Sequence, residues 1–227
     1  KGGLMIPRIS ARNMTFSLLS AAGDIDTLAT TRLSVIVVGA NPALSKSFYK
    51  STYIDEAIKP DCYSLNGKTP DKDCDDPQSD MCALCPQNAW GSRTTPTGQR
   101  VKACADQKRL AVVLADDPKG TVYLLQVTPT SLKNLNGYQK VLQSKSISPE
   151  IAKTRVSIDT SLGFPKLEFD FGGFVEESTQ EYIDGLCGNE EVKIVTGELS
   201  ASERQLTFSD FGFAEENGFT EGGQTNE

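Results

Sequence analysis

The chain has 227 residues, with 23 basic and 30 acidic side chains, a formal net charge of −7 and no histidine. The lack of histidine excludes the Ser-His-Asp and Cys-His arrangements of many hydrolases, and no G-x-x-x-x-G-K-[ST] run is present to hold a nucleotide phosphate. No apolar run approaches the roughly 20 residues that span a bilayer, so we expect one domain with appendages that is neither membrane-embedded nor an enzyme.

Residues 1–30 are expected to form an N-terminal extension, to which the sequence assigns no element. Pro7, Arg8 and Arg12 interrupt any apolar core of the length that a secretion signal needs, which argues against an oxidising compartment. The two arginines could extend a binding surface. The run TTRLSVIVVGA, at residues 30–40, is typical of a buried strand, and it opens the predicted main domain, residues 31–204.

Five of the six cysteines fall within residues 62–104. Cys82 and Cys85 form a C-x-x-C turn, whose two thiolates can reach one tetrahedral Zn²⁺. Without histidine, only cysteine or carboxylate can supply the other two ligands. We expect a structural zinc ion in an inserted loop at about residues 60–106. The expected ligands are Cys62, Cys82, Cys85 and Cys104, with Cys74 left out because its Pro- and Asp-rich surroundings indicate a surface loop.

Two alternatives for the cysteines stay open, a disulfide framework and free thiols. Cys187 lies far from the cluster and is interpreted as a small buried hydrophobic residue. The aspartates at positions 61, 71, 73, 75 and 76 could suggest a metal-dependent nuclease. They lie in a turn-rich stretch, which favours a solvated loop.

Basic residues cluster around Cys104, with only Asp106 among them. Such a local patch could follow the backbone of a nucleic acid although the whole chain is acidic. Trp90 could stack on bases or simply pack over the zinc turn. The candidate nucleic-acid contacts are Tyr63, Trp90, Arg93, Arg100, Lys102, Lys108 and Arg109.

Two β-hairpins are predicted in the second half of the chain. Residues 108–116 and 120–128 are β-rich runs joined by the turn sequence DDPKG. Residues 154–160 and 165–174 alternate apolar and polar side chains and are joined by SLGF. The two glycines within FGGF, at residues 171–174, predict a strand bend or bulge.

Two helices are predicted beside these hairpins. The first has Thr130 or Ser131 as its N-cap, and its apolar stripe should cover the sheet. That stripe consists of Leu132, Leu135, Tyr138 and Leu142. A shorter helix is expected across residues 176–188. The elements together predict a mainly β fold, a small Greek-key barrel of the OB type with one or two helices.

Residues 205–227 contain five acidic and no basic side chains. Their low aliphatic content predicts a disordered acidic tail. Phenylalanines among the acids suggest a partner-binding motif, or a segment that folds back over the basic patch. The motif residues are Phe208, Asp210, Phe211, Phe213, Glu215, Glu216 and Phe219.

Four runs of the chain resemble a group of bacteriophage zinc-containing OB-fold single-stranded DNA-binding proteins. They are PDCYSLNGKTP, CALCPQNAWGS, GQRVKACADQKRLAVVL and YLLQVTPTSLKNLNGY, within roughly Leu33 to Phe174. The resemblance implies zinc on Cys62, Cys82, Cys85 and Cys104, with Cys74 as a departure from the pattern. The tail is similar in composition to the C-termini of such proteins, although here Phe219 is followed by TEGGQTNE.

We therefore expect a sequence-tolerant single-stranded DNA-binding protein of phage replication or recombination, acting in the cytoplasm of the infected bacterial host. Its expected partners are single-stranded DNA and, through the tail, replication or recombination proteins; a homodimer is compatible with this reading. The alternative is a zinc-stabilised protein-interaction module that binds a host or phage polymerase or recombination factor without binding nucleic acid.

Overall fold

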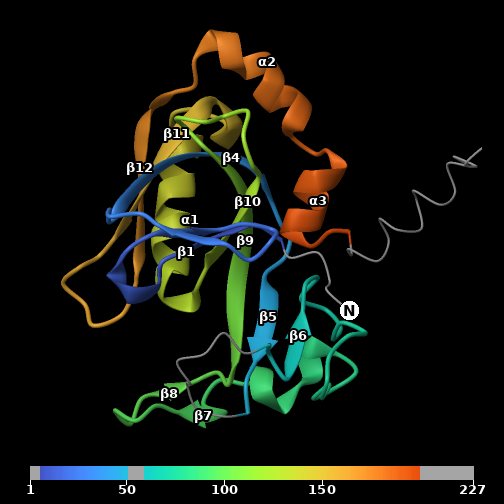
Figure 1. Ribbon diagram of the computed structural model, residues 1–227. Coiled ribbons are helices and arrows are strands. Elements are labelled where there is room, and N and C mark those ends of the chain that lie inside the picture. The colour runs from blue at the N-terminus through green and yellow to red at the C-terminus, as the bar shows by residue number, and fades with distance from the viewer. Residues whose placement is uncertain (1–5, 51–58, 200–227) are drawn as a thin grey trace, which may run out of the picture.

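The computed structural model describes residues 6–50 and 59–199, and it is mainly β (Figure 1). One sheet, in the order β12-β11-β4-β9-β10-β1-β2-β3, curls into a half-barrel. Its strands are β1 (Arg8–Ser10), β2 (Ser17–Leu19), β3 (Ile25–Thr27), β4 (Arg32–Ala40), β9 (Cys104–Leu114), β10 (Tyr123–Val127), β11 (Ala152–Ile158) and β12 (Leu167–Phe174). The helices are α1 (Pro129–Ser144), α2 (Glu177–Leu186) and α3 (Glu190–Thr196), and none of the described helices is long and apolar enough to cross a membrane.

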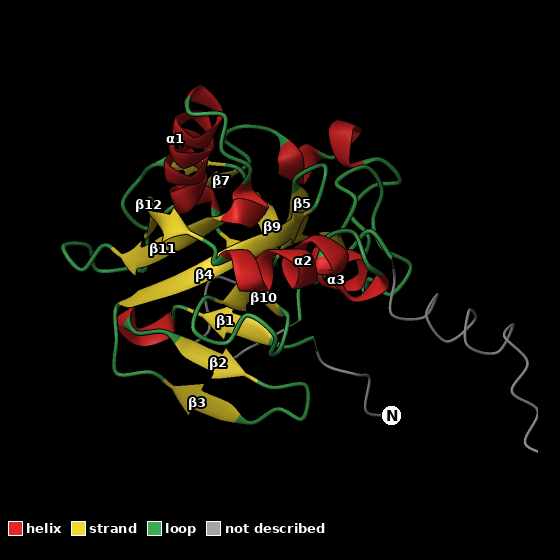
Figure 2. Cartoon of the chain, turned by 90° about the horizontal axis from the view of Figure 1, so that it is seen from above, coloured by secondary structure: helices red, strands yellow, loops and turns green. Residues whose placement is uncertain are grey.

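The two central strands are apolar on both faces because helices cover both faces of the sheet. Val35 and Val112 pack with α1, whereas Ile36 and Val113 pack with α2 and α3. Figure 2 shows α1 on one side of the sheet and α2 with α3 on the other. Burial on both sides explains why β4 and β9 are continuous apolar runs and not alternating ones.

Both predicted hairpins are confirmed. β9 and β10 pair antiparallel, with Tyr123 opposite Val112, and β11 and β12 pair antiparallel, with Phe169 opposite Val156. The register of the second hairpin shifts between Lys153 and Thr154. This confirms the bulge expected from the glycines at 172 and 173, the second of which has φ +126°.

The first predicted helix is confirmed, but its predicted start is wrong. α1 begins at Pro129 with Thr128 as N-cap; the ring of Pro129 fixes φ near the helical value, and its missing N–H would have no partner in the first turn. The stripe behaves as expected: Leu135, Tyr138 and Leu142 are buried and Leu132 packs against the same cluster. The second helix is confirmed as α2.

Three strands near the N-terminus and the helix α3 were not predicted. β1 adds to β10 in parallel, and β2 and β3 follow it antiparallel (Figure 2). α3 lies very close to β4, because a Cβ built on Gly39 would stand 2.3 Å from Cγ1 of Val192. A glycine at this position allows that approach.

The remaining strands carry a separate small unit, which we call the Cys module, residues 59–104. β5 (Ser45–Phe48) pairs with the first half of β9 and with β6 (Cys62–Ser64), while β4 pairs with the second half of β9. β7 (Arg93–Thr94) and β8 (Arg100–Val101) form a two-stranded ribbon. Figure 1 shows these strands at the bottom of the molecule, away from α1 and α2.

Asn41 lies between the end of β4 and the start of β5, and it bonds β9 at the point where the partner of β9 changes from one strand to the other. Its backbone N–H donates to the carbonyl of Arg109 at 3.1 Å, and its Oδ1 accepts from the Arg109 N–H at 2.8 Å. The Asn41 side chain therefore satisfies the backbone N–H of Arg109 at the point in β9 where neither β4 nor β5 pairs with it.

Candidate metal centre and nucleic-acid interface

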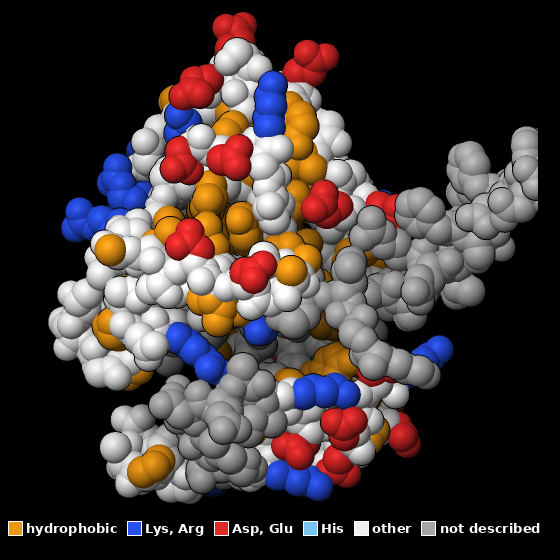
Figure 3. Space-filling view, in the orientation of Figure 1, with side chains coloured by type: hydrophobic (Ala, Val, Ile, Leu, Met, Phe, Trp, Pro, Cys, Tyr) orange, Lys and Arg blue, Asp and Glu red, His pale blue; other side chains and the backbone are white. Residues whose placement is uncertain are grey.

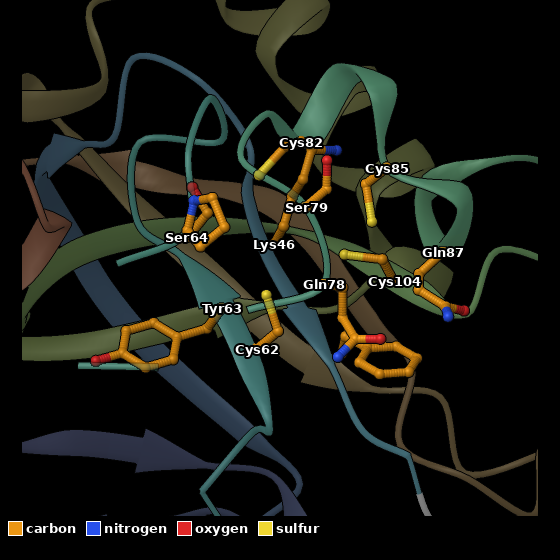
Figure 4. Close-up of a pocket in the computed structure, with 12 residues that line it drawn as sticks. Lys46, Cys62, Tyr63, Ser64, Gln78, Ser79, Cys82, Cys85, Gln87 and Cys104 are labelled. Carbon is orange, nitrogen blue, oxygen red and sulfur yellow. The ribbon is translucent and has the colours of Figure 1, made fainter. Parts of the chain in front are cut away.

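Four cysteines line one small cavity in the Cys module. They are the four that the sequence proposed, Cys62, Cys82, Cys85 and Cys104, and Figure 4 shows their sulfurs directed toward a common space. The cavity volume is about 10 Å³, close to what a single water-sized sphere requires. Its size therefore suits one ion and excludes an organic ligand.

Local chain geometry presents these sulfurs. Residues Cys82–Leu84 form a 3₁₀ turn that the Cys85 N–H closes on the Cys82 carbonyl at 3.4 Å, and Pro86 begins the next 3₁₀ turn, Pro86–Asn88. Cys62 begins β6 and Cys104 begins β9. The Cys module thus draws two ligands from a turn and two from strands.

Cys74 does not line the cavity. Its thiol donates to the carbonyl of Tyr63 at 3.0 Å and accepts from the N–H of the same residue at 3.1 Å. Both contacts hold the loop after β6 in place. All six cysteines are free thiols.

Burial and neighbouring thiols raise the pKa values of Cys104 and Cys62. Burial raises the pKa of Cys104 to about 11; Lys46 acts against this rise, and Cys85, Cys82 and Cys62 add to it. Burial also raises the pKa of Cys62, the backbone N–H of Gln78 opposes the rise, and Cys74 adds to it. Deprotonating several of these thiols together therefore needs a compensating positive charge.

A divalent metal ion that prefers thiolate ligands fits these four cysteines. None of the described residues that line the cavity is a carboxylate, and four thiolates in a closed site are a common environment for structural zinc. Within residues 6–50 and 59–199, the thiols surround the cavity without the close grouping of a completed metal site. We therefore treat zinc as part of the proposal below.

A network of charges supports the cavity from the side of β9. Asp106 bonds Lys46 at 2.5 Å and Lys102 at 2.8 Å, and both lysines also reach Oδ1 of Asn88, at 3.1 and 3.3 Å. Burial raises the pKa of Asp106, but the hydrogen bonds from Lys102 and Lys46 outweigh it and leave this pKa below its usual range. Asn88 also donates to the carbonyl of Cys82 at 2.9 Å, so the network holds the C-x-x-C turn.

Trp90 projects from the end of this turn and is 73 % exposed. It therefore does not pack over the turn, which was the structural alternative for this side chain. The next residue, Gly91, has φ +82°, and a Cβ built there would stand 2.5 Å from Nη2 of Arg100. The Arg100 guanidinium thus lies against Gly91, the residue that follows Trp90, and both Trp90 and Arg100 are exposed.

The other proposed DNA contacts differ in availability. Arg93 donates to the Tyr49 carbonyl and lies 5.6 Å from the ring centre of Phe48. Lys108 donates to the Asn41 carbonyl, and burial lowers its pKa. Among the five candidate cations, Arg100 is the one whose side chain makes no hydrogen bond or ion pair inside the described part of the chain, although its backbone pairs with Thr94.

Arg109 is buried, with 8 % of its surface exposed. Its guanidinium donates to the carbonyls of Val195 at 2.8 Å and Thr196 at 3.1 Å, at the C-terminal end of α3. Burial lowers the pKa of Arg109 to about 10, and Asp71 opposes this shift. This placement gives Arg109 a structural role that nothing in its sequence context signalled.

Tyr63 is half-buried in acidic surroundings. Lys59 lies 5.9 Å from its ring centre, and burial raises the pKa of Tyr63 to about 12, with Asp71 and Asp73 adding to the rise. Figure 3 shows acidic and basic side chains intermixed on the visible face of the Cys module. The proposed partner-binding residues of the tail, Phe208, Asp210, Phe211, Phe213, Glu215, Glu216 and Phe219, lie outside the described residues.

Comparison with known proteins gives no relative for this chain: no family model, no curated protein and no solved structure matches it.

Proposed function

We propose that this protein binds single-stranded DNA with little sequence preference, through the exposed side of a zinc-stabilised Cys module. The observation that carries the proposal is that an exposed aromatic side chain and an exposed cation lie at the same end of the C-x-x-C turn, the cation without a side-chain hydrogen bond or ion pair to any described residue. Trp90 is 73 % exposed, and the Arg100 guanidinium lies against the residue that follows it. An aromatic face stacks on any unpaired base for about 1–3 kcal/mol, and a neighbouring cation follows the phosphates.

Lys102 extends this surface. It follows Arg100 by two residues and keeps a third of its side chain exposed while it bonds Asp106. Arg93 lies opposite Val101 in the β7–β8 ribbon, so its side chain lies on the face of Val101 and not on that of Arg100. We therefore propose Trp90, Arg100 and Lys102 as the DNA contacts. Omitted are Arg93, which donates to the Tyr49 carbonyl, Lys108, which donates to the Asn41 carbonyl, Arg109, which is buried, and Tyr63, which lies among carboxylates.

The role proposed for the metal is structural. Cys62, Cys82, Cys85 and Cys104 would hold Zn²⁺, which would supply no chemistry beyond closing the Cys module. A loop of this length has only a small apolar cluster of its own, built around Phe48, Cys62, Ala103 and Cys104. Metal binding at such a site contributes folding free energy directly.

Strand order supports relating the half-barrel to an OB-type barrel. β4, β9, β10, β11 and β12, numbered 1 to 5 along the chain, lie in the order 5-4-1-2-3, with α1 between the third and fourth. This is the order of OB barrels. The Cys module then occupies the connection between the first two strands, a loop that OB folds use to bind oligonucleotides.

Fluorescence anisotropy of a labelled oligothymidine and of a duplex of equal length, at low and moderate salt, tests the proposal. Trp90→Ala and Arg100→Glu should each weaken binding to the single strand by about tenfold, because one base stack or one phosphate contact is lost. Lys133→Glu, the same charge change on the exposed face of α1, serves as the control. Equal affinity of all three variants and the parent chain would refute the interface.

A second candidate function is a zinc-stabilised module that binds a protein. It is favoured by the exposure of two apolar side chains on the same turn, Leu84 at 75 % and Met81 at 51 %, since adjoining exposed apolar residues mark interaction surfaces. Failure to bind either oligonucleotide, together with retained zinc and cooperative unfolding, would favour this candidate.

A further inference from the structure

The outer edge of β12 is only partly covered. β12 ends the sheet and, within the described residues, pairs with β11 alone. At Leu167 two side chains of α1 replace a neighbouring strand: Ser131 Oγ accepts from the Leu167 N–H at 2.9 Å, and Asn134 Nδ2 donates to its carbonyl at 2.9 Å. The edge is thus capped at its first residue.

The following residues leave this edge open. Backbone groups of an antiparallel strand point alternately to its two neighbours, so those of Phe169 and Phe171 point the same way as those of Leu167. No hydrogen bond to these outward groups is present in the part of the chain that the structure describes. A cavity of about 380 Å³ borders this stretch, between residues 168–171 and the face of α1 formed by Asn134, Gly137, Tyr138 and Val141.

Side chains around the cavity define what would fit. Glu168 and Asp170 are exposed, and the described residues that line the cavity include no lysine or arginine, whereas Val141 and Phe171 offer apolar contact. Gly137 lies in the middle of α1, where glycine costs about 1 kcal/mol relative to alanine. A Cβ built there would meet nothing within 4 Å, so the space beside Gly137 is open and only a much larger side chain would fill it.

We propose that this edge binds an extended segment of a partner protein, in which basic and apolar side chains alternate, as an added strand beside β12. Its backbone would bond the outward groups of Phe169 and Phe171. Its basic side chains would lie near Glu168 and Asp170, and its apolar ones against α1. Main-chain bonds supply affinity in such strand addition, and alternate side chains supply specificity.

Other occupants fit less well. Two copies paired through β12 would place Glu168 and Asp170 opposite acidic residues of the second copy, and like charges directly opposite are destabilising. Residues 205–227 carry five acidic and no basic side chains, so the chain's own tail would be repelled in the same way. A nucleic acid would be repelled through its phosphates.

The probe is a fluorescein-labelled heptapeptide of alternating lysine and valine, titrated into the full-length chain and followed by anisotropy. We expect saturable binding that Gly137→Trp, which fills the cavity, and Asp170→Lys each weaken by about tenfold or more. Gly137→Ala should bind like the parent chain, because the cavity stays open. Methylation of the peptide amides that face β12 should abolish binding, since strand addition needs these donors.

Three results would overturn the proposal. One is no binding to the parent chain. The second is binding that survives Gly137→Trp or amide methylation, which is the pattern of a peptide held by the acidic tail through charge alone. The third is a parent chain that sediments as a dimer while Gly137→Trp sediments as a monomer, since the edge would then pair two copies. Circular dichroism and the melting temperature establish that each variant is folded.

Discussion

Single residues decide whether the four cysteines act together as a metal site. Cys82 lines the cavity, whereas Cys74 does not line it and bonds the backbone of Tyr63. Cys82→Ser should therefore lose bound zinc and lower the melting temperature, because binding free energy at a structural site is folding free energy. Zinc stoichiometry and thermal unfolding of the purified chain measure both effects.

Cys74→Ser is the matched control for this change, since it makes the same replacement of sulfur by oxygen at another cysteine of the Cys module. It should keep one zinc ion per chain and lose only the weak hydrogen bonds of its thiol, a cost of about 1 kcal/mol or less. If Cys74→Ser released the metal and Cys82→Ser kept it, the ligand assignment would be wrong.

Sequence spacing singled out Cys82 and Cys85, two of the four cysteines that line the cavity, because a C-x-x-C turn restricts its own geometry. Cys62 and Cys104 could be proposed by elimination alone, and it is the pairing of β5 with both β6 and β9 that places them beside the turn. The role of Arg109 could not be predicted. Arg100 and Arg109 look equivalent in sequence, and only the position of α3 separates the buried guanidinium of Arg109 from the exposed one of Arg100.

At the scale of elements, long patterned segments were predictable and short ones were not. The strands of the hairpins have five to eleven residues of alternating or continuous apolar character, whereas β1, β2 and β3 have three residues each and show no period. α3 is rich in β-branched residues, which favour strands. It is helical because Asn189 caps it at the Val192 N–H, at 2.9 Å, and Gly197 ends it with φ +84°. Asn189 and Gly197 were therefore the residues from which this helix could have been predicted.

Arg109 makes a testable link between α3 and β9. The last carbonyls of a helix have no partner within the helix, and Arg109 bonds those of Val195 and Thr196. Arg109→Met keeps the apolar stem and leaves both carbonyls unpaired, so we expect a loss of about 2 kcal/mol of unfolding free energy. Amide exchange in α3 should rise more than in β11.

Arg155→Met is the control for that experiment, because Arg155 is an exposed arginine of β11. Its substitution should change stability by less than about 0.5 kcal/mol. Equal effects of the two substitutions on urea unfolding would show that the contact with α3 contributes nothing specific.

For the whole molecule, the proposed function requires an acidic chain to bind a polyanion. The five acidic charges of residues 205–227 make up most of the net charge of −7. The described chain reaches Leu199, close to the Cys module, since a Cβ built on Gly197 would stand 3.1 Å from Cβ of Leu65.

Deleting residues 206–227 should therefore tighten binding to oligothymidine at low salt, because a competing polyanion is removed. The gain should shrink as salt rises, since the screening length falls from about 30 Å at 0.01 M to about 8 Å at 0.15 M.

A second variant, with serine at Phe208, Phe211, Phe213 and Phe219, keeps every charge and separates docking from repulsion. If this variant binds as tightly as the truncated chain, the aromatic side chains hold the tail on the basic surface; if it binds like the parent chain, charge alone competes. Unchanged affinity after deletion, at low salt, would mean that the tail serves other partners and leaves the surface around Trp90 and Arg100 free.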